Sequence, residues 1–466
     1  MSKVVIIDGN GDGDWVITLA DLEQLGKQLL ADSPSAVEER VAAVGPDQLA
    51  SLIYTSGTTG RPKGVRLTHG PGRTPPRPST PSTCSARRPE LPVAAAGPRL
   101  RQSDAGAAAV DRVHHRHRRA RRKDRRQSRR AASHRHGAAP RIFEKAHARI
   151  EQMVAEQSRF KRTVFGWSMR VGLRVSAARQ AGRKPSRAAA LAYKLADRLV
   201  FSTIRERFGG RIRFFVSAAA ALDRNVAQWF DAIGITVLEG YGLTETAAAS
   251  FINRPHAYRF GTVGWPFPAT EVKIAGDGEI LLRGPGLMTS YHDLPDATTE
   301  ALDQDGWFHT GDIGEVDADG YLRITDRKKD MFKTSQGKYV APSAIEVRFK
   351  GLCPYVGELI VIGEAKPYCV ALVSLDREAI TDWAAKHGLA GRSFAEIAGD
   401  DRTRTLIAGY IDMLNSELNR WEQIKKFTIL DRELSIESGD LTPSMKLRRK
   451  VVVDKSADQI AALYQD

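Results

Sequence analysis

Residues 54–65 read YTSGTTGRPKGV, and the first two of them end the run LASLIYT at 49–55, which predicts a β-strand. The glycines let the backbone turn sharply, so that its N–H groups can face a bound anion, and the hydroxyl side chains add further donors. Lys63 supplies a compact positive charge that suits the β- and γ-phosphates of a nucleotide. The stretch therefore predicts a phosphate-binding loop that follows a strand.

This loop is not a Walker A motif. Pro62 and Gly64 flank the lysine, and no Ser or Thr follows it to begin a helix. A Gly/Thr-rich turn with a purely structural role is the alternative interpretation, but the length and composition of the stretch favour anion binding.

The chain around the loop alternates predicted strands and helices. Towards the N-terminus, KVVIID predicts a strand, and TLADLEQLGKQLLA predicts an amphipathic helix that begins with Thr18 and Asp21 in a capping box. Residues 141–208 are mainly helical and basic by pattern, and residues 212–242 follow the strand–helix–strand order of a wound sheet. For the basic helices, packing on their own domain is favoured over contact with a membrane surface.

The second half of the chain changes pattern twice. From Glu279 to Ile324 short strands alternate with turns such as DADG at 317–320, which predicts an antiparallel β subdomain. Further on, ELIVIG and YCVALVSL predict strands, and a long helix is predicted from about Thr403 to Trp421.

These patterns predict an α/β fold in two domains. A large N-terminal domain with wound mixed sheets plus a β subdomain is placed at residues 1–326, and a small α+β C-terminal domain is placed at residues 327–466. A chain of 466 residues with 42% hydrophobic residues is long enough to bury a core in each.

Other features of the sequence exclude some classes of protein. No apolar run reaches the roughly 18 residues of a membrane span and the N-terminus lacks a signal-peptide pattern, so we expect a cytoplasmic protein. Cys84, Cys353 and Cys369 are far apart in the sequence and predict neither a disulfide framework nor a zinc site.

Residues 70–139 differ in composition from the rest. From Pro71 to Ala138 the chain holds 17 Arg and one Lys against four acidic residues, so most of the net charge of +15 lies here. The stretch has no Phe, Trp or Tyr, holds five of the eleven His, and is dense in Pro, Ala, Gly and Ser. Such a segment cannot build a packed core.

Three interpretations of this segment stay open. It can be a basic arm that binds nucleic acid, a solvated linker, or a stretch read out of frame from a GC-rich gene. We favour the frame shift, because enzyme-like sequence stops at His69 and resumes near Pro140 with PRIFEKAHARI. No nucleic-acid partner is therefore expected; a nucleic-acid binder through residues 112–130 would show steeply salt-dependent affinity.

Further motifs follow the phosphate loop in order along the chain. They are EGYGLTET at 239–246, GWFHTGDIG at 306–314, RITDRKKD at 323–330 and LTPSMKLRRK at 441–450. Together with the loop, they resemble the signatures of the adenylate-forming superfamily: acyl-CoA synthetases, aryl-CoA ligases, luciferases and peptide-synthetase adenylation domains. The set is far more specific than any one motif.

The resemblance implies a nucleotide site. Tyr241 would stack on the adenine, since an aromatic face suits a purine. Thr244 would contact the adenylate phosphate and Glu245 would hold Mg²⁺, for which a carboxylate is a hard ligand, and both are implied in catalysis. The phosphates would be held by the loop residues Thr55, Ser56, Gly57, Thr58, Thr59, Gly60 and Lys63.

The later motifs would complete the site. By resemblance, Asp312 accepts hydrogen bonds from both ribose hydroxyls, and Arg327 also reaches the ribose. Lys329 is implied as the hinge on which the C-terminal domain pivots, with a plain surface charge as the alternative. Lys446 would be the mobile catalytic lysine that bridges the substrate carboxylate and the α-phosphate.

One stretch indicates the branch of the superfamily. DRKKDMFKTSQGKYVAPSAIE, at 326–346, is most similar to long-chain fatty acyl-CoA synthetases of bacteria. The resemblance covers most of residues 1–69 and 139–466 and implies ATP, Mg²⁺, a fatty acid and coenzyme A as ligands, with peripheral membrane contact as a further expectation. A fatty-acyl-AMP ligase and a catalytically disabled remnant are the alternatives.

Three departures from the family pattern stand out. The phosphate loop already begins near residue 55, whereas family members carry a long region before it, so we expect a shortened first subdomain. Residues 70–139 replace a region that holds an aromatic/His motif and part of the acyl tunnel. Finally, VSAAAAL at 216–222 stands where a Gly-Gly or Gly-Ala pair normally lines the adenine slot, so that Ala218 and Ala219 add methyl groups.

Overall fold

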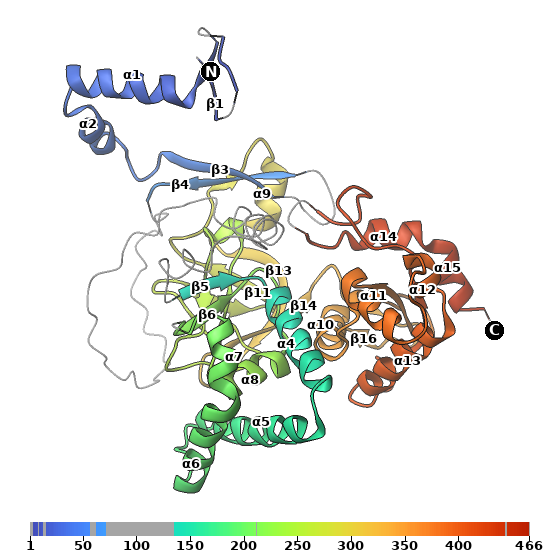
Figure 1. Ribbon diagram of the computed structural model, residues 1–466. Coiled ribbons are helices and arrows are strands. Elements are labelled where there is room, and N and C mark those ends of the chain that lie inside the picture. The colour runs from blue at the N-terminus through green and yellow to red at the C-terminus, as the bar shows by residue number, and fades with distance from the viewer. Residues whose placement is uncertain are drawn as a thin grey trace.

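The computed structural model (Figure 1) describes residues 3–7, 9–12, 15–55, 62–70, 135–210, 212–442 and 445–465. Its architecture is α/β, as the sequence predicts, with mixed sheets and a smaller C-terminal part. Most of the segment 70–139 lies outside the described residues.

The N-terminal unit is a short pair of strands followed by two helices. Strands β1 (Val4–Ile6) and β2 (Val16–Thr18) pair in parallel and lead into α1 (Leu19–Asp32) and α2 (Ala36–Ala42). The predicted capping box is confirmed, because the Asp21 N–H donates to Thr18 Oγ1 at 3.2 Å and the Thr18 N–H donates to Asp21 Oδ2 at 2.9 Å. No residue of α1 is buried.

The strand before the phosphate loop has the predicted bounds. Strand β3 (Leu49–Thr55) pairs antiparallel with β4 (Lys63–Thr68), and β12 (Ser290–Tyr291) pairs with the other edge of β4. Thr55 is the partner of Lys63 in the register, so the two ends of the loop lie side by side.

A five-stranded sheet forms the centre of the N-terminal part. Strands β5 (Arg135–Ala138), β6 (Phe214–Ser217) and β7 (Thr236–Tyr241) are parallel, and β8 (Phe251–Ile252) and β9 (Trp265–Pro266) continue the sheet antiparallel. The order is β5-β6-β7-β8-β9. The sheet is therefore mixed, as predicted for a wound fold.

Helices pack on this sheet through an aromatic core. The predicted helical stretch 141–208 is confirmed as α4 (Pro140–Ala155), α5 (Arg159–Gln180), α6 (Arg187–Ala196), the π-helical turn η1 (Asp197–Phe201) and α7 (Ser202–Arg207). Between β6 and β7 lies α8 (Arg224–Ala232). Phe143 of α4 meets Phe215 and Phe230 edge-to-face, with ring centroids 5.3 and 5.6 Å apart.

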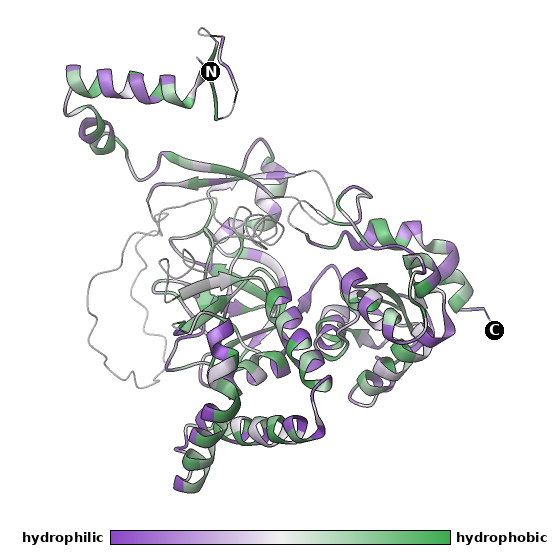
Figure 2. Cartoon of the chain, viewed as in Figure 1, coloured by the Kyte–Doolittle hydropathy of each residue, from purple (hydrophilic) through white to green (hydrophobic). Residues whose placement is uncertain are grey.

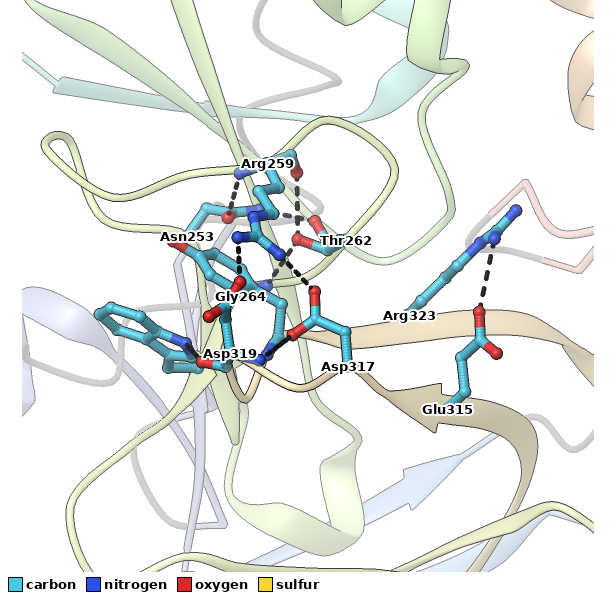
Figure 3. A network of polar contacts seen from close by, with 10 residues as sticks. Asn253, Arg259, Thr262, Gly264, Glu315, Asp317, Asp319 and Arg323 are labelled. Carbon is cyan, nitrogen blue, oxygen red and sulfur yellow. Dashed lines mark hydrogen bonds and ion pairs between the residues drawn. The ribbon is translucent and has the colours of Figure 1, made fainter. Parts of the chain in front are cut away.

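The predicted antiparallel β subdomain follows. Strands β10 (Glu271–Ile274), β11 (Glu279–Arg283), β13 (Phe308–Val316) and β14 (Leu322–Arg327) form one sheet in that order, with α9 (Pro295–Ala301) between β12 and β13. The predicted turn at 317–320 is held against the loop after β8 (Figure 3): Arg259 forms ion pairs with Asp317, at 2.6 Å, and with Asp319. Trp265 Nε1–H donates to the Asp319 carbonyl at 2.9 Å.

The C-terminal part has its own sheet and core. Strands β17 (Val356–Ile362), β18 (Cys369–Leu375) and β19 (Ile424–Ile429) form the order β17-β18-β19, and every residue of β18 is buried. The other elements are β15 (Phe332–Lys333), β16 (Tyr339–Val340), α10 (Pro342–Leu352), α11 (Arg377–Lys386), α12 (Phe394–Ala398), α13 (Asp401–Asn415), α14 (Arg449–Lys455) and α15 (Ala457–Leu463).

One predicted helix boundary is wrong. The helix expected to reach Trp421 ends at Asn415. The Asn415 amide explains the stop, because its Nδ2–H donates to the Ile424 carbonyl at 2.9 Å and its Oδ1 accepts from the Ile424 N–H at 2.9 Å. These two bonds hold the end of α13 beside the start of β19, which an unbroken helix could not allow.

Ion pairs join α4 and the residue that follows it, Glu156, to the C-terminal part. Lys145 lies 2.7 Å from Asp376, Arg149 lies 3.6 Å from Asp382, and Lys386 pairs with Glu156. The boundary at residues 326/327 stays a prediction. Among the described helices, none is both long and apolar enough to cross a membrane.

Candidate active site

The described ends of the phosphate loop are Thr55 and Lys63. Thr55 Oγ1–H donates to the Lys63 carbonyl at 3.4 Å. The Lys63 ammonium lies 4.7 Å from the centroid of the Tyr291 ring, which belongs to the neighbouring strand β12. Ser56, Gly57, Thr58, Thr59 and Gly60 lie outside the described residues.

The end of strand β7 brings Tyr241 to the subdomain sheet. Its side chain is buried, and its hydroxyl donates to Asp312 Oδ2 at 2.5 Å. The next residue, Gly242, must be glycine, because a Cβ there would lie 1.7 Å from the Ala248 carbonyl oxygen. The contact between Gly242 and the Ala248 carbonyl therefore fixes the turn that leads from β7 to Thr244 and Glu245.

Asp312 is the most enclosed group of the site. It lies on β13 with 3% of its surface exposed, and it faces Arg327 across the β13–β14 ladder, where Arg327 Nε lies 2.8 Å from Asp312 Oδ1. Burial raises the pKa of Asp312, and the charge of Arg327 and the Tyr241 hydrogen bond oppose that rise. A carboxylate offers about four acceptor positions, so oxygen lone pairs remain for a vicinal diol.

Glu245 and Thr244 lie in the short 3₁₀ turn η2 (Thr244–Thr246). Glu245 Oε1 accepts a hydrogen bond from the Tyr291 hydroxyl at 3.0 Å, and the Glu245 carbonyl accepts one from the Met288 N–H at 2.7 Å. The second carboxylate oxygen is a hard donor of the kind that Mg²⁺ binds together with substrate phosphates. The chemistry of this group therefore fits the expected Mg²⁺ ligand.

Lys446 reaches the same region from the end of the chain. Residues on both sides of it are held together: the Thr442 N–H donates to the Lys446 carbonyl at 2.8 Å, and Leu441 and Leu447 form an isolated antiparallel β-bridge. The pKa of Lys446 is lowered, first by the partial burial of its head group and then by the charge of Arg327, while Asp312 and Glu245 oppose the shift. The side chain as a whole stays exposed. Lys446 therefore lies within the electrostatic reach of both site carboxylates.

Lys329 is not part of this cluster. It is exposed in the turn that follows β14, between the two parts of the chain. Nearby, the Ser343 hydroxyl and N–H donate to the Asp326 carboxylate at 2.6 and 3.1 Å, which ties β14 to the start of α10. The hinge role of Lys329 stays a prediction.

The alanine-rich loop after β6 has an unusual backbone. Ala219 adopts φ 77°, in the left-handed region that glycine occupies without strain. The Leu222 N–H donates to Glu239 Oε2 at 3.2 Å, and burial raises the pKa of Glu239 to about 7. This loop therefore lies beside β7, and its role as a wall of the adenine slot stays a prediction.

Sequence reasoning missed two residues of the cluster. Tyr291 contacts both Glu245 and Lys63, and Thr310 Oγ1 accepts the Asp312 N–H at 3.1 Å. Thr310 stands in the quoted motif GWFHTGDIG, so its place in the sequence was a usable signal. Tyr291 belongs to none of the quoted motifs, and only the pairing of β12 with β4 reveals it.

Known families match both parts of the chain. The family described as AMP-binding enzyme matches residues 3–71 and 131–292, and the family described as AMP-binding enzyme C-terminal domain matches residues 329–466. The gap between the first two ranges falls inside the segment 70–139 that composition sets apart.

Individual relatives agree with these families. The long-chain-fatty-acid–CoA ligase FadD15 of Mycobacterium bovis is 34% identical over 95% of this chain and 74% of its own length. The peroxisomal long chain acyl-CoA synthetase 6 of Arabidopsis thaliana is 32% identical over 90% of this chain and 61% of its own length.

A solved structure supports the fold. The adenylation domain of a carboxylate reductase from Mycobacterium chelonae superposes with a TM-score of 0.56 at 21% identity, over 90% of this chain and 61% of that chain. With the matched families and relatives, this leads to one conclusion. The chain belongs to the AMP-binding enzyme family, in the branch that holds the long-chain fatty-acid–CoA ligases.

Proposed function

We propose that this chain is a long-chain fatty-acid–CoA ligase, which activates a fatty acid with ATP to an acyl-adenylate and transfers the acyl group to coenzyme A. The similarity to FadD15 supports the substrate class. The observation that carries the proposal is the convergence of Lys446, Asp312, Glu245 and Arg327, which come from different motifs of the chain, on one site.

The chemistry needs positioning and charge neutralisation. In the first half-reaction a carboxylate oxygen attacks the α-phosphorus of ATP, the bond to the bridging oxygen breaks, and pyrophosphate leaves. Lys446 would bridge the two negatively charged reactants, and Lys63 would hold the β- and γ-phosphates. In the second half-reaction the thiol of coenzyme A attacks the acyl carbon, loses its proton and releases AMP.

The nucleoside would be held by the enclosed groups. Asp312, fixed by Tyr241 and Arg327, would accept the ribose hydroxyls, and Tyr241 would lie against the adenine. Mg²⁺ would be held by Glu245 and would neutralise charge on the phosphates. Thr244 is proposed as the hydroxyl donor to the α-phosphate, and Lys329 as the hinge between the two half-reactions.

Fatty-acid-dependent exchange of labelled pyrophosphate into ATP tests the first half-reaction. We expect exchange in the wild-type chain and a loss of at least about a hundredfold in Lys446→Ala, because a charged transition-state contact is removed. Lys450→Ala, four residues away and also exposed, is the matched control and should exchange normally.

The outcomes separate the alternatives. Acyl-CoA formed only when coenzyme A is added supports the ligase. Exchange without acyl-CoA would favour the fatty-acyl-AMP ligase, and a folded protein without exchange would mark the chain as a disabled remnant and overturn the proposal.

We also propose peripheral contact with an anionic membrane through α5, α6 and α7. Residues 159–207 hold 13 Arg and Lys against two acidic residues. Phe160 and Leu191 stand among them with 77% and 71% of their surface exposed, and Figure 2 shows green residues among purple ones along these helices. A basic helix with exposed apolar side chains suits a lipid headgroup region.

Vesicle co-sedimentation tests this contact. We expect binding to vesicles with phosphatidylglycerol, weaker binding at high salt, and little binding to pure phosphatidylcholine. Phe160→Ala with Leu191→Ala should weaken the binding several-fold, since both apolar anchors are lost. Equal binding of wild type and double variant would contradict the role of these helices.

A further inference from the structure

Tyr291 lies between two groups that the proposed function assigns to ATP. Strand β12 pairs antiparallel with β4, so that Tyr291 faces Val65, two residues after Lys63. The tyrosine is 8% exposed and packs in a small core with Val65, Met288 and Phe308. Its backbone is also anchored, because the Tyr291 N–H donates to Thr298 Oγ1 at 2.9 Å. The side chain is therefore held in one place.

From this place Tyr291 contacts two opposite charges. Its hydroxyl donates to Glu245 Oε1 at 3.0 Å, and its ring face receives the Lys63 ammonium at 4.7 Å from the centroid. The segment before it binds the same turn, since the Met288 N–H donates to the Glu245 carbonyl at 2.7 Å. The short segment 288–291 thus holds both the backbone and the carboxylate of Glu245.

A neutral side chain is well suited to this position. Without this hydrogen bond, the Glu245 carboxylate would form an ion pair with Lys63 or Lys446. It would then no longer be available to bind a divalent cation. Tyr291 orients the carboxylate through a hydrogen bond and the ammonium through the face of its ring, and it neutralises neither. Among the described residues, no ion pair joins Glu245 to Lys63 or Lys446.

We infer that Tyr291 is a positioning residue for the magnesium–ATP complex, which acts by holding the Glu245 carboxylate towards Mg²⁺ and the Lys63 ammonium towards the phosphates. The inference rests on the proposed function, and it adds a residue outside all the sequence motifs of the site.

The two contacts can be removed separately. Tyr291→Phe keeps the ring for Lys63 and loses only the hydroxyl that holds Glu245. Tyr291→Leu loses both contacts. Tyr321→Phe is the matched control, because Tyr321 is also buried and also carries a cation on its ring, Arg259 at 4.5 Å, but lies outside the site cluster.

Calorimetric titration with ATP, with and without Mg²⁺, measures the effect without relying on turnover. In Tyr291→Phe we expect affinity for ATP with Mg²⁺ to fall about tenfold and affinity without Mg²⁺ to change less than about twofold, since only the metal carboxylate is released. Tyr291→Leu should weaken both titrations, and Tyr321→Phe should weaken neither.

The outcomes separate this inference from the function on which it rests. A Tyr291→Phe variant that binds magnesium–ATP like wild type would overturn the inference and leave the ligase proposal intact. An equal loss with and without Mg²⁺ in Tyr291→Phe would also overturn it, because it indicates a purely structural role. A wild-type protein that binds no ATP at all would overturn both.

Discussion

Helices α1 and α4 are of similar length and are both amphipathic by pattern, yet they have opposite surroundings. In Figure 1, α1 lies apart from the body of the molecule, and its leucines, such as Leu22 and Leu25, are 44% and 48% exposed. By contrast, α4 lies between the N-terminal sheet and the C-terminal part, with Phe143 only 1% exposed.

The difference shows that the hydrogen bonds that start a helix are distinct from the packing that stabilises it. Helix α1 has a capping box at Thr18, whereas α4 begins at Pro140 without a side-chain cap. The better-capped helix is therefore the less packed one. Local hydrogen bonds specify where a helix begins, while burial against neighbours supplies most of its stability.

Truncation of one apolar side chain in each helix should give the largest difference in stability between α1 and α4. Phe143→Ala is expected to lower the free energy of unfolding by about 3–5 kcal/mol, because it leaves a cavity beside Phe215 and Phe230. Leu25→Ala is expected to change it by less than about 0.5 kcal/mol. Urea unfolding followed by tryptophan fluorescence measures both, and similar losses would show that α1 is packed in solution.

The next largest effect is the pH dependence of the unfolding free energy that Glu144 of α4 causes. Burial raises the pKa of Glu144 from 4.5 to about 7, against the opposing charge of Lys350. The folded state thus favours the neutral acid, so this contribution to stability is full below the unfolded pKa and is lost as pH rises towards about 7. Glu144→Gln should remove a decline of about 2–3 kcal/mol over this range.

The matched control for this titration is on α1. Glu23 is exposed there, and Glu23→Gln should change the free energy of unfolding by less than about 0.5 kcal/mol. If the unfolding free energy of Glu144→Gln declined with pH as steeply as that of the wild type, the Glu144 carboxyl would be solvated. That result would contradict its buried position between the two parts of the chain.

Removal of the α1 cap has the smallest expected effect on the whole molecule. Thr18→Ala should make the opening of α1 easier by about 1 kcal/mol, since the Asp21 N–H loses its acceptor. The free energy of global unfolding should stay the same, because α1 buries no residue. Hydrogen exchange of α1 amides measures the local loss, and a matching global loss would contradict the separation of the two helices.

Much of the local structure could be predicted. The bounds of β3, the capping box of α1 and the antiparallel β subdomain follow from periodicity and from hydrogen bonds within a few residues. The end of α13 could not be predicted, because the Asn415 side chain stops the helix through bonds to Ile424, nine residues away. The open surroundings of α1 could not be predicted either, since amphipathicity indicates a face to bury but not whether a neighbour covers it.

The class of fold, the order of the motifs and the chemical types of the site residues can be read from the amino-acid sequence alone, because each depends on neighbours within a short stretch of chain. The three-dimensional fold is needed to see that Tyr241 and Arg327 hold Asp312, and that Tyr291 holds Glu245. Those contacts join residues up to 71 positions apart and depend on how strands pair, which no local pattern encodes.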